Sequence, residues 1–197
     1  MSDRDLFEVF NASEGLHGGW LLLLRWLSSH VAWMALVAVG VTLVVGPAAV
    51  RRSMARVMFG AVLAAVLALL IALVFPQPRP ADLSLGHQYL HPLLPSGFPS
   101  VHVTVLWSLA FGALVLRPTL AALGGVLLPL GLLVGWSRVY LGVQFPSDVL
   151  ASALVAACAV GIVHLLRRPI EIELTGPLMR SIDARTARWR RLRAPRR

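Results

Sequence analysis

Apolar residues fill five stretches of this chain that approach or reach the length needed to cross a membrane. A transmembrane helix requires about 20 predominantly apolar residues. The predicted spans are Val31 to Val50, Val57 to Phe75, Val101 to Leu116, Leu120 to Val139 and Val149 to Leu166. The pattern therefore predicts an all-α integral membrane protein, built as a bundle of five transmembrane helices.

The N-terminal part is less uniformly apolar. Leu16 to Ser29 is shorter than a full span and carries Arg25 near its middle. We expect this segment and Asp5 to Phe10 to form interfacial or partly inserted helices. A sixth span over Leu16 to Ser29 is the alternative. Because Met1 to Glu14 is acidic, we expect no cleavable signal peptide.

Composition places the chain in the membrane class. Its 197 residues are 57% apolar and 14% charged, and the mean hydropathy is +0.76. The net charge of +9 comes from arginine alone, since there is no lysine. Most of the arginines cluster outside the apolar spans, which favours anchoring to anionic headgroups over binding to nucleic acid. The single cysteine, Cys158, excludes a disulfide framework and is expected to be a small core residue.

The distribution of arginine predicts the orientation. Three places that share one side of a five-span chain are basic: Arg51, Arg52 and Arg56; Arg117; and Arg167 with Arg168. By the positive-inside rule this side is cytoplasmic. The connections Pro76 to Ser100 and Tyr140 to Asp148 then face outward. The rest of the tail is predicted to be a basic amphipathic or disordered anchor, with arginines at 180, 185, 188, 190, 191 and 193.

Two charges at membrane depth indicate a functional site. Arg138 and Asp148 are the only charged residues between Arg117 and Arg167. Ionisable groups at such positions usually face a polar cavity and one another. The alternative is an ion pair between Arg138 and Asp148 that only holds two helices together.

Two further segments of the outward side could join this site. Arg79 lies between prolines, which prevent a helix and stiffen its backbone, and a guanidinium group suits a phosphate. A helix that begins at Val101 directs free N–H groups toward an anion. Ser100 could cap that helix or donate to a phosphate, and His102 could act as a general acid. The alternatives are a boundary anchor for Arg79 and a helix-start role for His102.

These segments resemble the motifs of the type 2 phosphatidic acid phosphatase superfamily: Arg-Pro, Pro-Ser-x-His and Ser-Arg-x5-His-x3-Asp. The resemblance covers Leu6 to Arg168 and is greatest to its bacitracin-resistance type of undecaprenyl pyrophosphate phosphatase. It implies metal-independent hydrolysis through a phosphohistidine, without a cofactor, on the periplasmic side of a bacterial inner membrane. The lipid product serves peptidoglycan synthesis. The implied division is 1–30 interfacial helices, 31–168 the transmembrane phosphatase domain and 169–197 a basic cytoplasmic tail.

The resemblance also implies roles for individual residues. Arg79, Ser100, Arg138 and the helix N-terminus at Val101 would hold the phosphate. His102 would protonate the leaving group, and Asp148 would support the nucleophile. The lysine of the first motif is absent, and Ala72 stands at its usual spacing.

Gln144 occupies the position of the nucleophilic histidine. An amide nitrogen has no available lone pair, so the resemblance predicts a chain that binds lipid phosphate, with Gln144 contacting the phosphate or Asp148, but scarcely turns it over. The other motif residues are in place, which favours a histidine-to-glutamine replacement in a working phosphatase. The alternatives are a non-hydrolysing lipid-phosphate carrier, a phosphatidylglycerophosphate or phosphatidate phosphatase, and a structural membrane protein. His87 and His91 are expected to be loop histidines outside the site.

Overall fold

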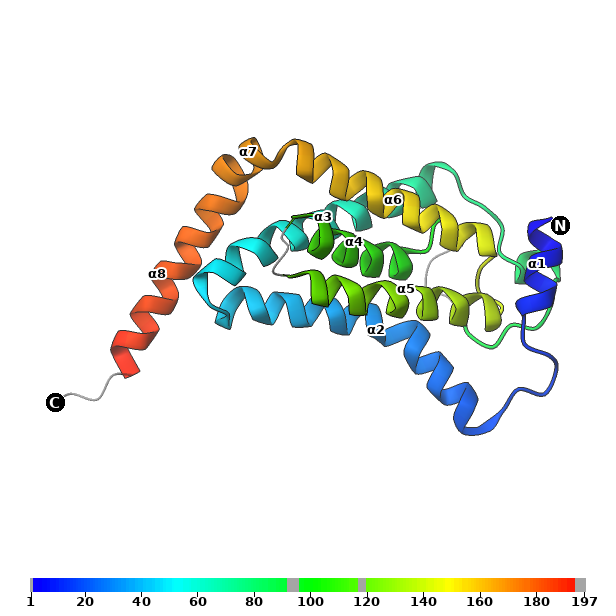
Figure 1. The fold of residues 1–197 in the computed structure, drawn as a ribbon. Helices are drawn as coiled ribbons and strands as arrows, with labels where there is room; N and C mark the ends of the chain where they lie inside the picture. Colours follow the sequence, from blue (N-terminus) through cyan, green and yellow to red (C-terminus); the bar gives the residue numbers. More distant parts are fainter. Residues whose placement is uncertain (1, 92–95, 117–119, 194–197) are drawn as a thin grey trace.

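The structure is a computed structural model that describes residues 2–91, 96–116 and 120–193, with side chains except at 116 and 186–193. Over these residues the chain is helical and has no strand, which confirms the predicted fold class. Five long helices form the bundle in Figure 1: α2 (Gly18–Val45), α3 (Ala48–Val74), α4 (Val101–Leu116), α5 (Ala121–Tyr140) and α6 (Pro146–Leu165).

The remaining elements lie at the two ends of this bundle. The helix α1 (Asp3–Phe10) and the 3-10 turn η1 (Ala81–Leu83) lie at one end. At the other end are α7 (Arg167–Ile170), a π-helical turn η3 (Glu171–Thr175) and α8 (Gly176–Arg193), which extends away from the bundle.

The shortest of the five bundle helices, α4, forms the centre of the bundle. It packs against α2, α3, α5 and α6, and Val103, Leu106, Leu109 and Ala113 on it are fully buried. The helices α2, α3, α5 and α6 are each long and apolar enough to cross a membrane. Large apolar side chains remain exposed on their outer faces, as expected where a helix meets lipid.

The prediction for the first span was wrong at both ends. One continuous helix, α2, runs from Gly18 to Val45 in place of an interfacial segment followed by a span, and no separate sixth span forms there. Arg25 does not interrupt it, because Arg25 Nε donates to the carbonyl oxygen of Tyr89 at 2.6 Å. The chain turns at Gly46 and Pro47, where α2 is capped and α3 begins.

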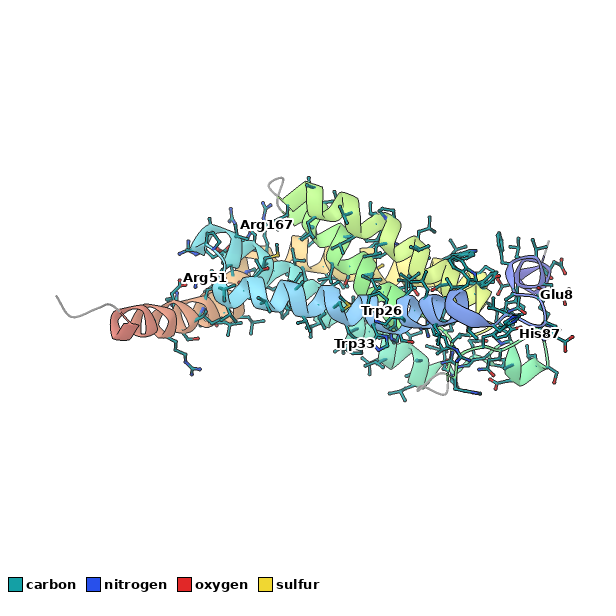
Figure 2. The ribbon with its side chains drawn as sticks, turned by 90° about the horizontal axis from the view of Figure 1, so that it is seen from below. Glu8, Trp26, Trp33, Arg51, His87 and Arg167 are labelled. Atoms are coloured by element: carbon teal, nitrogen blue, oxygen red, sulfur yellow. The ribbon has the colours of Figure 1, made fainter. Side chains whose placement is uncertain are left out.

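The arginines expected between the first two spans instead lie in the first turns of α3. Arg51 and Arg56 form ion pairs with Asp183 and Glu171, which belong to α8 and η3. Arg51 and Arg167 lie toward one end of the molecule in Figure 2, and Glu8 and His87 lie toward the other. Arg117 and the side chains of Arg188, Arg190, Arg191 and Arg193 fall outside the described residues.

The predicted N-terminal helix is present as α1. Ser2 and Asp5 form a reciprocal capping box at its start. Hydrogen bonds from Ser2 lower the pKa of the Asp5 carboxyl. Phe7 is fully buried, and its ring meets that of Phe145 edge-on at 5.5 Å. The helix therefore docks beside the start of α6.

Candidate active site

Arg79 joins two of the segments that carry the predicted site. Its Nη2 donates to the carbonyl oxygen of Ser96 at 2.6 Å, and its Nη1 donates to that of Val143 at 2.9 Å. Burial lowers the pKa of Arg79, against the opposing attraction of Asp148 and Asp82. The rigid backbone that follows α3 thus places this guanidinium between the loop before α4 and the loop before α6.

Arg138 brings the end of α5 into the same cluster. It is 6% exposed, and its Nε donates to Gln144 Oε1 at 2.6 Å. Its Nη1 donates to the carbonyl and hydroxyl oxygens of Ser28 on α2, at 3.3 and 3.4 Å. A buried arginine held by neutral oxygens retains its full positive charge, which attracts an anion.

Gln144 is held at both ends of its side-chain amide. While Oε1 accepts from Arg138, Nε2 donates to the carbonyl oxygen of Gly97 at 2.6 Å. The backbone at Gly97 is tightly surrounded: a Cβ atom there would lie 3.2 Å from Asp148 Oδ2 and 3.4 Å from Arg79 Cγ. A glycine at 97 therefore allows three site residues, Arg79, Gln144 and Asp148, to approach the same point of the backbone.

Asp148 lies beside this cluster without pairing to Arg138. Its Oδ2 accepts from the backbone N–H of Phe145 at 2.8 Å, across the first turn of α6. Among the described residues there is no ion pair between Arg138 and Asp148 and no hydrogen bond between Asp148 and Gln144. The contact geometry thus differs from the alternative of a helix-pinning ion pair.

Ser100 and His102 come from the start of α4. The backbone N–H of Ser100 donates to Ser152 Oγ at 2.9 Å, and Ser152 Oγ contacts the carbonyl oxygen of Asp148 at 2.7 Å. The Ser100 hydroxyl is buried and has no hydrogen-bond partner among the described residues, so it does not cap the helix. The His102 ring meets that of Trp33 edge-on at 6.1 Å.

A cavity of about 300 Å³ opens at this cluster. Five of the predicted site residues line it: Arg79, Val101, His102, Arg138 and Gln144. The other lining residues are Ser29, His30, Trp33, Leu90, His91, Ser96 and Pro99. Ser100 and Asp148 do not line this cavity, and the hydrogen bonds given above join them to Ser152 and Phe145, which do not line it either.

Some residues of this cavity were not predicted from the sequence. Ser29 and His30 line the cavity, and Ser28 beside them bonds to Arg138. These three consecutive polar residues interrupt a mostly apolar helix, and that interruption is the signal that could have identified them. His91 lines the cavity although a loop role was expected for it. His87 does not line the cavity. Its backbone N–H and carbonyl oxygen form hydrogen bonds with the Asn11 side chain.

The donor set suits a phosphate. Two buried guanidinium groups and the N-terminus of α4 supply positive potential. In the part of the chain that the structure describes, no group of three or more His, Cys, Asp or Glu side chains could hold a metal ion. The cavity can therefore bind an anion by hydrogen bonds from Arg79, Arg138 and the backbone.

The sequence profile of the PAP2 superfamily matches residues 53–170, which is more than half of the chain. The chain belongs to the PAP2 superfamily. The predicted family is thus confirmed, and the matched PAP2 segment contains Arg79, Ser100, His102, Arg138, Gln144 and Asp148.

Two individual proteins resemble this PAP2 chain. It is 37% identical over 81 residues to the Escherichia coli K12 protein "Putative undecaprenyl-diphosphatase YbjG", a match that covers 41% of this chain and 40% of that protein. The crystal structure of Aquifex aeolicus LpxE matches with a TM-score of 0.62 and 23% identity, over 80% of this chain and 92% of that one. The second likeness shows a shared fold.

Proposed function

We propose that this chain is a polyprenyl diphosphate phosphatase of the PAP2 superfamily, specific for undecaprenyl pyrophosphate, in which Gln144 abolishes most of the turnover. The observation that carries the proposal is the cavity where Arg79, Arg138 and His102 meet at the start of α4. The name of the Escherichia coli relative supports the choice of substrate.

In this proposal the diphosphate lies against the two guanidinium groups. Arg79 and Arg138 each reach the cavity while bonded to neutral oxygens, so their charges remain available to a phosphate. The backbone N–H groups at the start of α4, where Val101 lines the cavity, would donate to the remaining phosphate oxygens.

The substrate's isoprenoid tail would lie in an apolar cavity next to the polar one. This second cavity of about 180 Å³ lies between α2, α3 and α4 and is lined by Leu36, Val62, Leu69 and other apolar side chains. Both Trp33 and His102 line this cavity and the polar cavity of the candidate active site. A ligand with a diphosphate at one end and a hydrocarbon chain at the other fits this succession of polar and apolar walls.

With histidine at position 144, a ring nitrogen would attack the terminal phosphorus as its bond to the bridging oxygen breaks. His102 would give its proton to that oxygen, so undecaprenyl phosphate leaves. Water would then cleave the phosphorus–nitrogen bond and release phosphate, while Asp148 supports the charged ring at 144. We place this reaction on the periplasmic side of a bacterial inner membrane.

Gln144 blocks the first of these steps. Its amide nitrogen cannot form the covalent intermediate, and the loss of a covalent nucleophile costs about a million-fold in rate in another hydrolase class. Gln144 also accepts a hydrogen bond from Arg138 Nε, so the guanidinium keeps a defined position. Substrate binding should survive while turnover should not.

The test is phosphate release from undecaprenyl pyrophosphate without added metal, by this chain, by Gln144→His and by Gln144→Asn as the matched control. We expect release from the histidine variant and little from the other two. Equal substrate binding by all three, with no release by any, would replace the phosphatase with a lipid-phosphate carrier. Faster hydrolysis of phosphatidate or phosphatidylglycerophosphate by Gln144→His would contradict the proposed substrate.

A further inference from the structure

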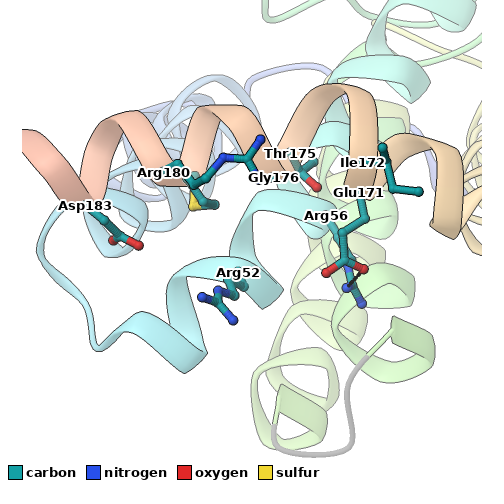
Figure 3. A pocket seen from close by; sticks show the side chains of 9 residues that line it. Arg52, Arg56, Glu171, Ile172, Thr175, Gly176, Arg180 and Asp183 are labelled. Atoms are coloured by element: carbon teal, nitrogen blue, oxygen red, sulfur yellow. Dashed lines mark hydrogen bonds and ion pairs between the residues drawn. The ribbon is translucent and has the colours of Figure 1, made fainter.

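A second polar cavity lies at the opposite end of the molecule from the candidate active site, whose cavity, lined by Arg79, His102, Arg138 and Gln144, we call the phosphatase cavity. It measures about 400 Å³ and lies between the first turns of α3 and the segment formed by η3 and α8 (Figure 3). Its lining residues are Arg52, Arg56, Glu171, Ile172, Thr175, Gly176, Met179, Arg180 and Asp183. Most of them lie outside residues 53–170, which match the PAP2 profile.

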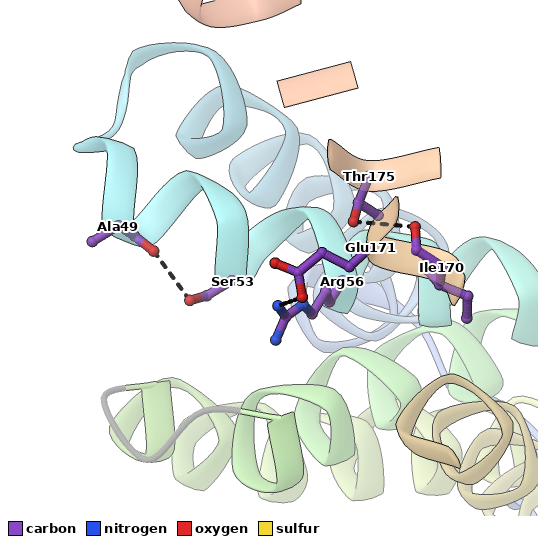
Figure 4. Close-up of polar contacts among 6 residues, drawn as sticks. All are labelled: Ala49, Ser53, Arg56, Ile170, Glu171 and Thr175. Carbon is purple, nitrogen blue, oxygen red and sulfur yellow. Dashed lines mark hydrogen bonds and ion pairs between the residues drawn. The ribbon is translucent and has the colours of Figure 1, made fainter. Parts of the chain in front are cut away.

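The acidic side chains of this cavity are already paired. Glu171 forms an ion pair with Arg56, drawn in Figure 4, and Asp183 forms one with Arg51. Arg52 and Arg180 also line the cavity, and among the described residues neither makes a side-chain hydrogen bond or ion pair. Two positive charges therefore remain unbalanced in one concave site.

The hydroxyl groups near the cavity are also engaged. Thr175 Oγ1 donates to the carbonyl oxygen of Ile170 at 3.4 Å, and Ser53 Oγ donates to that of Ala49 at 3.1 Å (Figure 4). The donors left for a ligand are thus the guanidinium groups of Arg52 and Arg180, which offer a phosphate two parallel hydrogen bonds each.

An exposed apolar side chain, Ile172, lines the cavity. Leu174 and Leu178 are exposed on the same segment, η3 and α8, without lining it. The same end carries Arg167 and Arg168 at the close of the bundle, where a membrane-spanning helix reaches the headgroup region. A basic pocket at such a depth, beside apolar side chains, is the arrangement that binds anionic lipid headgroups.

We propose that this cavity binds the phosphate of an anionic phospholipid headgroup through Arg52 and Arg180, with the acyl chains beside the exposed side chain of Ile172. The bound lipid would join the first turns of α3 to α8 and hold the C-terminal helix against the membrane surface. This site is independent of the phosphatase cavity and does not require that the chain hydrolyse any lipid.

The test compares two double variants of the full chain that remove the same charge from the same end. Arg52→Gln with Arg180→Gln empties the cavity of its unpaired cations. Arg168→Gln with Arg185→Gln removes two exposed arginines that do not line it. Binding is measured by native mass spectrometry in a neutral detergent, titrating phosphatidylglycerol, phosphatidylcholine or inorganic phosphate. Neither pair of substitutions alters the phosphatase cavity, so any lipid or phosphate that binds there contributes equally to the measurements on both variants.

Each cavity arginine should contribute about fivefold to phosphatidylglycerol affinity. The affinity should therefore fall roughly 25-fold in Arg52→Gln with Arg180→Gln, and less than about threefold in the control variant. Phosphatidylcholine binding should not change. If inorganic phosphate alone depends on Arg52 and Arg180, the site takes a free phosphate ion in place of a lipid. Equal losses of phosphatidylglycerol affinity in the two double variants would contradict the proposed binding site.

A folding control keeps the result decisive. Arg52→Lys with Arg180→Lys retains both charges, so it should keep most of the phosphatidylglycerol affinity. If the glutamine pair does not fold, the single variants Arg52→Gln and Arg180→Gln are measured in its place. Unchanged affinity in both singles would likewise overturn the proposal.

Discussion

At the scale of single residues, Gly97 determines whether the side chains of the site can pack together. Its carbonyl oxygen holds Gln144, and its Cα lies against Arg79 and Asp148. An added methyl group would come within 3.2 Å of the Asp148 carboxylate, so the carboxylate or the loop must shift.

We therefore expect Gly97→Ala to destabilise the protein by about 1–3 kcal/mol through overpacking and to weaken binding of undecaprenyl pyrophosphate. Gly125→Ala is the matched control, because nothing lies within 4 Å of a Cβ atom at that position. Alanine is about 1 kcal/mol more favourable than glycine in a helix, so the control should be neutral or stabilising. Thermal unfolding in detergent and a lipid-binding titration measure both effects. Equal stability and affinity in the two variants would contradict the assigned role of Gly97.

The sequence predicted the charged residues of the site more completely than their partners. Charge is expensive at membrane depth, so Arg138 and Asp148 stood out in an apolar background. The partners are neutral and distant along the chain: Ser28 lies 110 residues from Arg138, and Gly97 lies 47 residues from Gln144. Only the folded bundle brings them together, because no local pattern encodes a contact between separate helices.

At the scale of elements, α2 shows that contacts between distant parts of the chain also make helix boundaries hard to predict. Arg25 indicated a break between an interfacial segment and a span, yet the helix continues through it. The carbonyl oxygen that accepts from Arg25 belongs to Tyr89, 64 residues away. The last three predicted spans lie close to α4, α5 and α6, whereas α3 begins at Ala48, nine residues before the predicted Val57.

The helix α1 is the element that supports the loop containing Gln144. Asp3 accepts from the backbone N–H of Ser147 at 3.0 Å and from its hydroxyl at 2.5 Å, at the start of α6. Phe7 packs on Phe145, next to Gln144 in the chain. Docking of α1 therefore restrains the backbone that presents Gln144 and Asp148.

Removing the buried ring should release this restraint. Phe7→Ala is expected to cost about 3–5 kcal/mol, since the side chain is fully buried, and to weaken substrate binding. Phe10→Ala is the control on the same helix, because Phe10 is 46% exposed. Chemical denaturation of both variants, with hydrogen exchange at residues 144–148, measures the effect. Unchanged exchange at these residues in Phe7→Ala would show that α1 does not restrain the loop.

At the scale of the whole molecule, the two ends of the bundle differ in charge and in chemistry. The phosphatase cavity lies at the end that carries α1, and the arginines of α3, α7 and α8 lie at the other. Arginine-rich ends of membrane proteins are retained in the cytoplasm. We therefore propose that the phosphatase cavity faces the outside of the membrane.

This orientation is testable by labelling single cysteines in intact cells. The native thiol, Cys158, is exposed, so the prediction that it is a small core residue was wrong, and it is first replaced by serine. In that background, Glu14→Cys marks the end with the phosphatase cavity and Ala184→Cys marks the basic end, both at exposed positions. A membrane-impermeant maleimide applied after the outer permeability barrier is opened should label position 14 at once. Position 184 should react only after the inner membrane is also broken, and the reverse order would place the phosphatase cavity in the cytoplasm.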